Sequence, residues 1–366
     1  MDANLVKEWL VYVGTYTTGK SEGLYVYRMD ASTGELKYSS QVKGVDNPTF
    51  LTIDKQRQTL YALYEIHEHE GGESGAVGAY SIDSATGELT LINQQSSVGT
   101  GPCHLILDKT EKFILVANYG GGSVSILPIL GGGQLGEATE FIQHEGSSVN
   151  PERQMEAHAH SIYVDRNNNF AITPDLGMDK VLVYNFDSTK GKLKLNEELC
   201  FLSKAGAGPR HFTFHPNGKY AYLINELDST MVAFTYDESK GKLSEVQTLS
   251  TLPKDFNGTN HCADLHIDPS GKFLYGSNRG HDSLVIYEID ESTGRIKLVG
   301  HEPTQGKFPR NFAIDPTGNW LLAANQDTDT IVTFRRDQQT GRLTPAGHVA
   351  DVPAPVCLEL IPFAFV

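Results

Sequence analysis

The sequence predicts an all-β protein, a seven-bladed β-propeller with four antiparallel strands in each blade. A glycine-containing phrase of the type TGEL or KGKL occurs seven times along the 366 residues. Its copies lie 46 to 58 residues apart, which is the size of one propeller blade. No segment shows the sustained periodicity of an amphipathic helix. The glycines of the phrase are Gly34, Gly87, Gly133, Gly191, Gly241, Gly294 and Gly341.

Each phrase fits the turn between a third strand, such as VLVYNFD at 181–187, and an outer fourth strand. Glycine suits that turn because it adopts positive φ without strain. Two more strand-like segments separate the copies, one ending in Asp-Pro or a similar pair (HFTFHP, DLHIDP, NFAIDP) and one rich in β-branched and aromatic residues (YAYLINE, FLYGSNR). The chain starts with a second-strand sequence (WLVYVGT) and ends with a first-strand sequence (VCLELIP). We therefore expect the C-terminal strand to pair with the N-terminal strands and close the ring.

The composition limits the partners and the cellular location that the protein can have. A net charge of −15 at pH 7 argues against a nucleic-acid or anionic-membrane partner, because either would require a basic face. No window approaches the roughly 20 apolar residues of a membrane span, and the first residues lack a signal-peptide pattern, so we expect a cytoplasmic protein. No linker divides the sequence, which predicts a single domain over 1–366. The four cysteines are widely spaced and are expected to be reduced, buried thiols.

The repeat register predicts which residues gather at one mouth of the propeller. In antiparallel blades the first strand starts at the mouth where the second strand ends. The residue six before the terminal proline of each first strand then forms a ring of Thr49, Cys103, His160, Arg210, Ala263, Arg310 and Val356. The residue after each of these includes His211 and Asp264. The ends of the second strands add Glu65, Tyr119, Asn225, Glu226, Arg279, Asn325 and Gln326.

Arg210, Arg279 and Arg310 come from three blades, yet the register places them together in an acidic protein. Clustered cations repel one another unless an anion or carboxylates offset them, so we predict an anion-binding site. Glu226 is either a counter-charge to Arg210 or a general acid or base. His158 and His160 are two residues apart, so they lie on the same side of a strand and could bind a metal ion with Asp175 or Asp264 as a third ligand. The favoured interpretation is that the imidazole is catalytic or orients the substrate. The Asn residues also suit strand ends as turn formers.

Long segments of the sequence resemble the propeller-type lactonase family, represented by bacterial 6-phosphogluconolactonase and related to fungal carboxy-cis,cis-muconate cyclase. The matching segments are VGTYT at 13–17, HAHS at 158–161, DLGMDKVLVYN at 175–185, GPRHFTFHPNGKYAYLINEL at 208–227, ADLHIDPSGKFLYGSNRG at 263–280 and FPRNFAIDPTGNWLLAANQ at 308–326. The resemblance implies a catalytic quartet of His160, Arg210, Glu226 and Arg279, with Arg310, Asn325 and Gln326 around it. Family members vary before the shared histidine, so His158 is a weaker candidate than His160.

The sequence and the resemblance together lead to a functional hypothesis. We expect hydrolysis of a sugar-acid lactone, 6-phosphogluconolactone of the pentose phosphate pathway, with Glu226 or His160 as general base and arginines holding the oxyanion and the phosphate. No metal or other cofactor is expected. Alternatives are a lactonising or cyclising isomerase of an unsaturated diacid, and a non-catalytic propeller that binds a protein or a small ligand. The expected substrate contacts are His158, His211, Asn225, Asp264, Arg310, Asn325 and Gln326.

Overall fold

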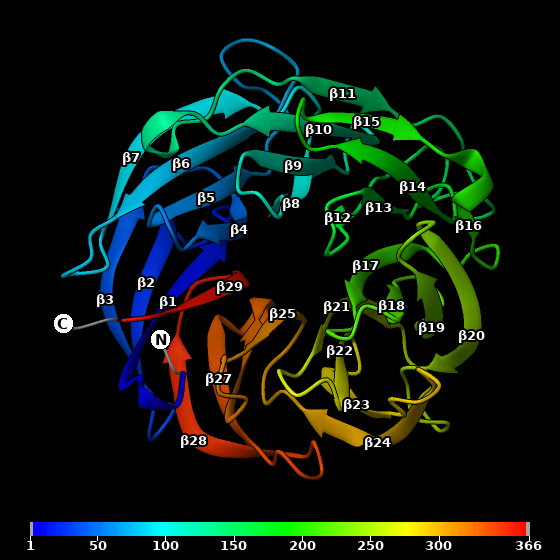
Figure 1. The fold of residues 1–366 in the computed structure, drawn as a ribbon. Coiled ribbons are helices and arrows are strands. Elements are labelled where there is room, and N and C mark those ends of the chain that lie inside the picture. Colours follow the sequence, from blue (N-terminus) through cyan, green and yellow to red (C-terminus); the bar gives the residue numbers. More distant parts are fainter. Residues whose placement is uncertain (1–2, 364–366) are drawn as a thin grey trace.

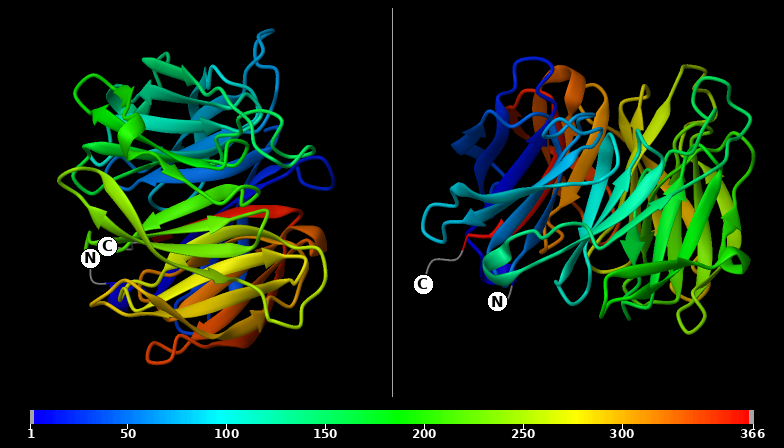
Figure 2. Two further views of the ribbon diagram at one scale, coloured as in Figure 1. Left: turned by 90° about the vertical axis from the view of Figure 1, so that its right-hand side faces the viewer. Right: turned by 90° about the horizontal axis from the view of Figure 1, so that it is seen from above.

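The computed structural model describes residues 3–363. Their strands form seven separate sheets, and Figure 1 shows these sheets as blades arranged in a ring, with one strand of each blade nearest the centre. The two perpendicular views in Figure 2 show the blades standing side by side around that centre. The predicted all-β propeller with seven blades is therefore confirmed. Residues 1, 2 and 364–366 of the predicted domain lie outside the described part.

The blades are numbered here along the chain, and the strands of each are given from the centre outward. Blade 1 contains β29 (Pro355–Pro362), β1 (Glu8–Thr15), β2 (Gly23–Asp30) and β3 (Leu36–Lys43). Blade 2 contains β4 (Pro48–Asp54), β5 (Thr59–Tyr64), β6 (Ala76–Ile82) and β7 (Leu89–Ser96). Blade 3 contains β8 (Pro102–Leu107), β9 (Phe113–Asn118), β10 (Ser123–Pro128) and β11 (Glu140–Gln143). Blade 4 contains β12 (Tyr163–Val164), β13 (Phe170–Asp175), β14 (Lys180–Asp187), β15 (Lys192–Leu195) and β16 (Phe201–Leu202).

The remaining three blades are the most regular. Blade 5 contains β17 (Pro209–Phe214), β18 (Tyr220–Asn225), β19 (Thr230–Asp237) and β20 (Lys242–Ser250). Blade 6 contains β21 (His261–Ile267), β22 (Phe273–Arg279), β23 (Ser283–Ile289) and β24 (Ile296–Pro303). Blade 7 contains β25 (Pro309–Ile314), β26 (Trp320–Asn325), β27 (Thr330–Arg336) and β28 (Leu343–Asp351). Helical structure within residues 3–363 is limited to the 3-10 turns η1 (Ala3–Leu5), η2 (Gly131–Gly133), η3 (Glu197–Leu199) and η4 (Gln326–Thr328).

The ring closes as the ends of the sequence predict. Strand β29 pairs antiparallel with β1, from Trp9 opposite Pro362 to Gly14 opposite Cys357. The last strand of the chain thus becomes the innermost strand of the first blade (Figure 1). Closure of this kind leaves no blade without a neighbour and removes sheet edges that would invite aggregation.

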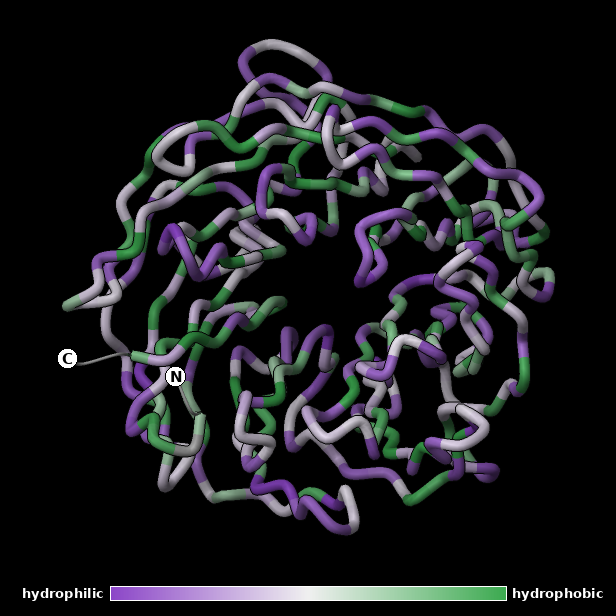
Figure 3. Tube along the Cα trace, in the orientation of Figure 1, coloured by the Kyte–Doolittle hydropathy of each residue, from purple (hydrophilic) through white to green (hydrophobic). Residues whose placement is uncertain are grey.

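Apolar side chains hold the blades together in layers. Buried hydrophobic residues form seven clusters, one at each interface between adjacent blades. Between blades 7 and 1, for example, Trp9 and Trp320 are both buried. Figure 3 accordingly shows hydrophobic residues distributed around the whole ring rather than in one central cluster. The hydrophobic effect therefore stabilises each interface, while the centre of the ring is left for polar side chains.

The seven predicted turn glycines all adopt positive φ, between 61° and 81°. At Gly294 a second requirement is added, because a Cβ atom there would lie 2.3 Å from the ring of Tyr220 in the preceding blade. The hydroxyl of Tyr222 also donates to the Gly294 carbonyl at 2.9 Å. The glycine turn of one blade is thus a docking point for the second strand of its neighbour, which explains why glycine recurs at this position.

Blades 3 and 4 depart from the predicted pattern. The outer strand expected directly after Gly133 begins only at Glu140. Pro128 ends the neighbouring strand β10 and lacks the amide hydrogen that a continuous ladder between the two strands needs. In blade 4 the outer strand is interrupted by η3, so that β15 and β16 pair separately with β14. The first strand of this blade is reduced to β12, although the His160 amide still donates to the Pro174 carbonyl at 3.0 Å. These two blades carry the longest irregular segment near the centre, residues 144–158.

No helix within residues 3–363 combines the length and apolar character needed to cross a bilayer.

Candidate active site

A polar pocket of about 250 Å³ lies at the centre of the ring. First strands, the ends of second strands and the loop 144–158 all contribute to its wall. The predicted rings of the two strand ends therefore meet in one cavity. The lining residues are Glu65, Cys103, Tyr119, Arg153, His160, Glu226, His261, Arg279, Phe308 and Arg310.

A β-bulge aims the first-strand residues into the centre. In blade 5, Pro209 pairs with Asn225 and His211 pairs with Ile224, which leaves Arg210 as an extra residue without a partner. The same shift occurs at Arg310 in blade 7 and at Cys103 in blade 3. Bulges redirect side chains next to binding sites because the extra residue leaves the regular alternation of the strand. Six of the seven ring residues found by counting back from the prolines thus lie at bulges, and the seventh, His160, precedes the short strand β12.

Glu226 is the hub of the pocket. One carboxylate oxygen, Oε2, accepts from Arg210 Nε at 2.9 Å and lies 3.0 Å from Arg279 Nη2. The other, Oε1, accepts from Arg153 Nη2 at 2.8 Å. Burial by itself would raise the pKa of Glu226, but the charges of Arg279, Arg210 and Arg153 hold it well below its ordinary value. The group is therefore a fixed anion at every physiological pH.

Arg210 and Arg279 have few donors to spare. Arg210 Nη1 donates to the Ala263 carbonyl, and Arg279 donates to the carbonyls of His261 at 3.2 Å and Cys262 at 2.9 Å. Both side chains are almost completely buried. Their guanidinium planes are consequently locked by the backbone as well as by Glu226, which preorganises the positive charge.

Arg310 is different. Among the residues that the structure describes, its guanidinium makes no hydrogen bond and no ion pair. It lies over the ring of Tyr16, with Cζ 5.3 Å from the ring centroid. The neighbouring carboxylate of Glu65 accepts from Tyr16 at 2.9 Å and from Thr49 at 2.8 Å. A half-buried arginine without an anion partner is a ready site for a phosphate or carboxylate.

His160 faces Glu226 across the pocket, with Nε2 3.8 Å from Oε2. Its other ring nitrogen lies 3.6 Å from the sulfur of Cys103. Burial, followed by the charges of Arg210, His211 and Arg310, holds the pKa of His160 well below its ordinary value. The imidazole is therefore neutral near pH 7 and carries a lone pair that can accept a proton. The thiol of Cys103 is protonated, because burial raises its pKa strongly.

A second polar cluster lies directly beneath the pocket, around Asp264. This carboxylate accepts from His211 Nδ1 at 2.8 Å, His266 Nε2 at 2.8 Å and Asn311 Nδ2 at 2.6 Å. Burial, assisted by Arg210, lowers the pKa of His211 to about 4. His211 lines a narrow pocket shared with Arg210 and other central residues, so it touches the site from below, whereas Asp264 lines neither cavity.

The other predicted substrate contacts lie beside the pocket rather than in its wall. His158 stacks on Tyr119, with ring centroids 4.4 Å apart, and its Nδ1 donates to the Tyr119 carbonyl. Asn225 donates to Thr230 at 2.9 Å. Two further side chains of this group make local hydrogen bonds: Asn325 donates to the Thr304 carbonyl and Gln326 donates to Asp327.

Several residues of the pocket wall were not chosen as site residues from the sequence. Arg153, Tyr119, His261 and Phe308 line the cavity but were not among the predicted site residues. Tyr119 stood in the predicted ring and could have been chosen by its position. Arg153 had no such signal, because it belongs to the irregular segment 144–158 and has no counterpart in the other repeats.

The described side chains of this region do not form a metal-binding site. Residues 3–363 contain no group of three or more His, Cys, Asp or Glu side chains arranged to hold an ion. Asp175, considered as a third ligand beside His158 and His160, instead accepts from His144 Nδ1 at 2.7 Å. The cysteines described by the structure are unpaired, and Cys200 is only partly buried, in contrast to the expected full burial of all four.

Comparison with known proteins gives consistent matches over most of the chain. Residues 10–360 match the family model described as lactonase, 7-bladed β-propeller. The 6-phosphogluconolactonase of Bacillus subtilis is 36% identical over 308 residues, 83% of this chain and 84% of that protein. The 6-phosphogluconolactonase of Formosa agariphila is 39% identical over 308 residues, 83% of this chain and 85% of that protein. The structure of the periplasmic gluconolactonase of Pseudomonas aeruginosa superposes with a TM-score of 0.92 at 32% identity, covering 98% of this chain and all of the other.

Proposed function

The chain belongs to the family of seven-bladed β-propeller lactonases, and on that basis we propose that it hydrolyses 6-phosphogluconolactone to 6-phosphogluconate at the pocket around Glu226. Membership confirms the family resemblance seen in the sequence. Relatives named for 6-phosphogluconolactone and for gluconolactone both occur. The choice between these two substrates rests on the charge of the pocket.

The observation that carries the proposal is an excess of positive charge. Four guanidinium groups surround the pocket, those of Arg153, Arg210, Arg279 and Arg310, against the two carboxyl groups of Glu226 and Glu65. Because a phosphate monoester carries close to two negative charges near pH 7, it balances this excess, whereas an unphosphorylated lactone does not. The substrate phosphate would therefore bind among the guanidinium groups and offset the repulsion between them.

The same geometry favours His160 over Glu226 as the general base. Both oxygens of Glu226 already accept charge-assisted hydrogen bonds, and its depressed pKa makes it a weak proton acceptor. His160 is neutral and makes no hydrogen bond through Nε2 among the described residues. The carboxylate of Glu226 lies close enough to stabilise the imidazolium that forms when His160 takes a proton.

In the proposed reaction a water molecule attacks the lactone carbonyl carbon while His160 accepts one of its protons. The carbonyl oxygen becomes an oxyanion, which Arg310 stabilises, since this guanidinium lies near His160 and has free donors. The tetrahedral intermediate then breaks the bond between the carbonyl carbon and the ring oxygen. The imidazolium returns its proton to that ring oxygen, which becomes a hydroxyl. The new carboxylic acid ionises and releases one proton for each lactone opened.

The direct test is the rate at which the purified protein opens 6-phosphogluconolactone, followed by proton release and corrected for the spontaneous reaction. We expect wild-type protein to exceed the spontaneous rate and His160→Gln to lose at least about 100-fold of that acceleration, the range typical of a general base. Arg166→Gln is the matched control, because Arg166 pairs with Glu238 on an exposed surface. Absence of acceleration by the wild-type protein would refute the proposed function.

We further propose that the enzyme acts in the cytoplasm, in the pentose phosphate pathway. The described cysteines are unpaired, which suits a reducing compartment. One structural relative is periplasmic, so fractionation of the producing cells, with detection of the protein and of the lactonase activity, tests the assignment. Recovery of the activity in a periplasmic fraction would contradict it.

A further inference from the structure

The loop 144–158 delivers an arginine to the pocket from outside the strand register. Arg210, Arg279 and Arg310 lie on strands of blades 5, 6 and 7, but Arg153 lies on the connection between blades 3 and 4. Its Nη2 donates to Glu226 Oε1 at 2.8 Å and to the Tyr119 hydroxyl at 3.2 Å. Arg153 thus reaches the same carboxylate as the strand arginines by a separate route.

Arg153 keeps donors free toward solvent. Among the described residues, neither its Nε nor its Nη1 makes a hydrogen bond, and the side chain is 32% exposed, compared with 2% for Arg210 and 5% for Arg279. A guanidinium offers its donors in a planar fork that matches two phosphate oxygens. The free edge of Arg153 is therefore suited to an anionic group at the outer, more exposed end of the substrate.

A buried hydrogen-bonded array fastens both ends of this loop. At the start of the loop, His144 Nδ1 donates to Asp175 Oδ2 at 2.7 Å. At its end, the His158 amide donates to Asp175 Oδ1 at 2.9 Å. The middle of the loop is held by Gln154, which is fully buried and donates to the Leu176 carbonyl at 2.8 Å. One carboxylate at the end of β13 therefore holds both ends of the segment that carries Arg153.

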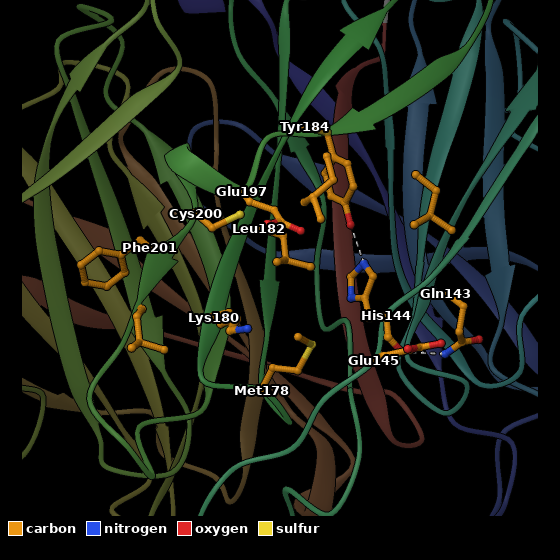
Figure 4. A pocket seen from close by; sticks show the side chains of 13 residues that line it. Gln143, His144, Glu145, Met178, Lys180, Leu182, Tyr184, Glu197, Cys200 and Phe201 are labelled. Atoms are coloured by element: carbon orange, nitrogen blue, oxygen red, sulfur yellow. Dashed lines mark hydrogen bonds between the residues drawn. The ribbon is translucent and has the colours of Figure 1, made fainter.

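Tyr184 completes this array from the next strand. Its hydroxyl lies 2.7 Å from His144 Nε2, and Figure 4 shows the hydroxyl pointing at the imidazole on the wall of an outer pocket of about 640 Å³. Because the Asp175 carboxylate accepts from Nδ1, Nε2 is the acceptor and Tyr184 the donor. All three side chains of the array are buried, so water does not compete for these bonds.

In two other blades a tyrosine lies at the equivalent position, but its hydroxyl makes a simpler contact. Tyr287 and Tyr27 occupy the same fifth position of their third strands as Tyr184. Their hydroxyls donate to backbone carbonyls at the end of the preceding blade, those of Ser250 at 2.6 Å and Asp351 at 3.0 Å. In blade 4 the same hydroxyl meets a loop side chain instead. The interblade hydrogen bond of blades 1 and 6 is thus replaced in blade 4 by an attachment point for the loop.

We propose that Arg153 is a specificity-determining residue that binds the phosphate of the lactone substrate, and that Asp175, His144 and Tyr184 are positioning residues that hold its loop in place. This inference rests on the proposed function and deepens it. Arg310 near His160 then serves the reacting carbonyl, while Arg153 serves the distal anion. Arg310 and Arg153, the two arginines with free donors, thus bind the two ends of the substrate.

The first test compares kcat/KM for 6-phosphogluconolactone and for unphosphorylated gluconolactone in Arg153→Gln. We expect the ratio of the two values to fall about 10- to 100-fold, the usual effect of losing hydrogen bonds to a charged group, with most of the change in KM for the phosphorylated lactone. Arg166→Gln should leave the ratio as in wild type. An active Arg153→Gln enzyme with the wild-type ratio overturns the inference while the lactonase proposal stands; an inactive wild-type enzyme overturns both.

The second test asks whether the array acts through Arg153. Tyr184→Phe should lower the same ratio about three- to tenfold in the wild-type background, and by less than about twofold in the Arg153→Gln background, because coupled residues are not additive. Tyr287→Phe removes the equivalent hydroxyl in blade 6 and should leave the ratio unchanged in both backgrounds. Equal effects of Tyr184→Phe with and without Arg153, or an equal effect of Tyr287→Phe, would show a general structural role and refute the positioning claim.

Discussion

Two buried carboxylates lie at the centre of the ring, and their surroundings differ. Glu226 is contacted by the guanidinium groups of three arginines. Asp264 is contacted by two imidazoles and one amide, from His211, His266 and Asn311. In both cases burial would raise the pKa, and the hydrogen-bonded or charged neighbours hold it well below the ordinary value.

The difference lies in what remains after the carboxylate is satisfied. Around Glu226 the cations outnumber the anions, Arg310 has no anion partner, and an open pocket adjoins them. Around Asp264 the donors are used within the cluster. A site with surplus charge and open volume can bind a ligand, whereas a balanced buried cluster chiefly stabilises the fold. We therefore expect every substitution around Glu226 to lower catalysis, whatever its effect on stability, and substitutions around Asp264 to lower stability with a smaller effect on catalysis.

The largest effect is expected for Glu226→Gln. Loss of the anion leaves three guanidinium groups close together, so kcat/KM should fall about 100- to 1,000-fold and the free energy of unfolding should fall by about 3 to 5 kcal/mol. Steady-state kinetics and urea unfolding measure the two quantities. A variant that retained activity within about threefold of wild type would remove Glu226 from the proposed site.

Arg310→Ala should separate catalysis from stability. It removes a cation that no described carboxylate pairs with, so kcat/KM should fall about 10- to 100-fold, while stability should change by no more than about 1 kcal/mol for the lost contact with Tyr16. Arg336→Ala gives the opposite pattern, since Arg336 is buried against Asp268 at 3.0 Å away from the pocket. Similar profiles for the two variants would contradict the distinction between surplus and paired arginines.

Asp264→Asn should have its main effect on folding. The neutral amide loses the charge-assisted bonds to His211 and His266, which should cost about 1 to 3 kcal/mol of unfolding free energy. The accompanying fall in kcat/KM should be smaller than that of Arg310→Ala. If kcat/KM fell more than in Arg310→Ala with unchanged stability, the lower cluster would belong to the substrate-binding site, as predicted from the sequence for His211 and Asp264.

The smallest effect concerns pH. An ordinary imidazole with a pKa of about 6.5 would lose its basic form as the pH falls through that value. The depressed pKa of His160 means that the neutral form persists below it, so kcat should not fall as the pH passes through about 6.5. A tenfold loss of kcat per pH unit beginning near 6.5 would show that the base has an ordinary pKa.

The repeat explains how much of this could be predicted. The seven glycines set the number of blades because each adopts positive φ where its turn packs against the second strand of the neighbouring blade, as Gly294 does against Tyr220. Counting back from the strand-ending prolines located Arg210 and Arg310 because a bulge recurs at the same position in most blades. Glu226 and Arg279 followed because antiparallel strands return to the same mouth.

Features outside the repeat could not be predicted in this way. Arg153 reaches the pocket through a loop whose path depends on the side chains of Gln154 and Asp175, and no periodic signal encodes such contacts. Asn225 and Asn325 fitted the register, but their amides bond to Thr230 and to the Thr304 carbonyl. Register gives the place of a side chain along a strand; its rotamer depends on neighbours from other strands.

The measurement that tests the central claim most directly is the ratio of kcat/KM for 6-phosphogluconolactone to kcat/KM for gluconolactone in the wild-type enzyme, with the spontaneous rates subtracted. Surplus positive charge around Glu226 predicts a preference of at least about tenfold for the phosphorylated lactone, since an additional charge-assisted contact contributes that much. This preference should shrink as salt is added, because salt screens the charge of the partly exposed Arg153. A ratio of one or less at low salt would contradict the account.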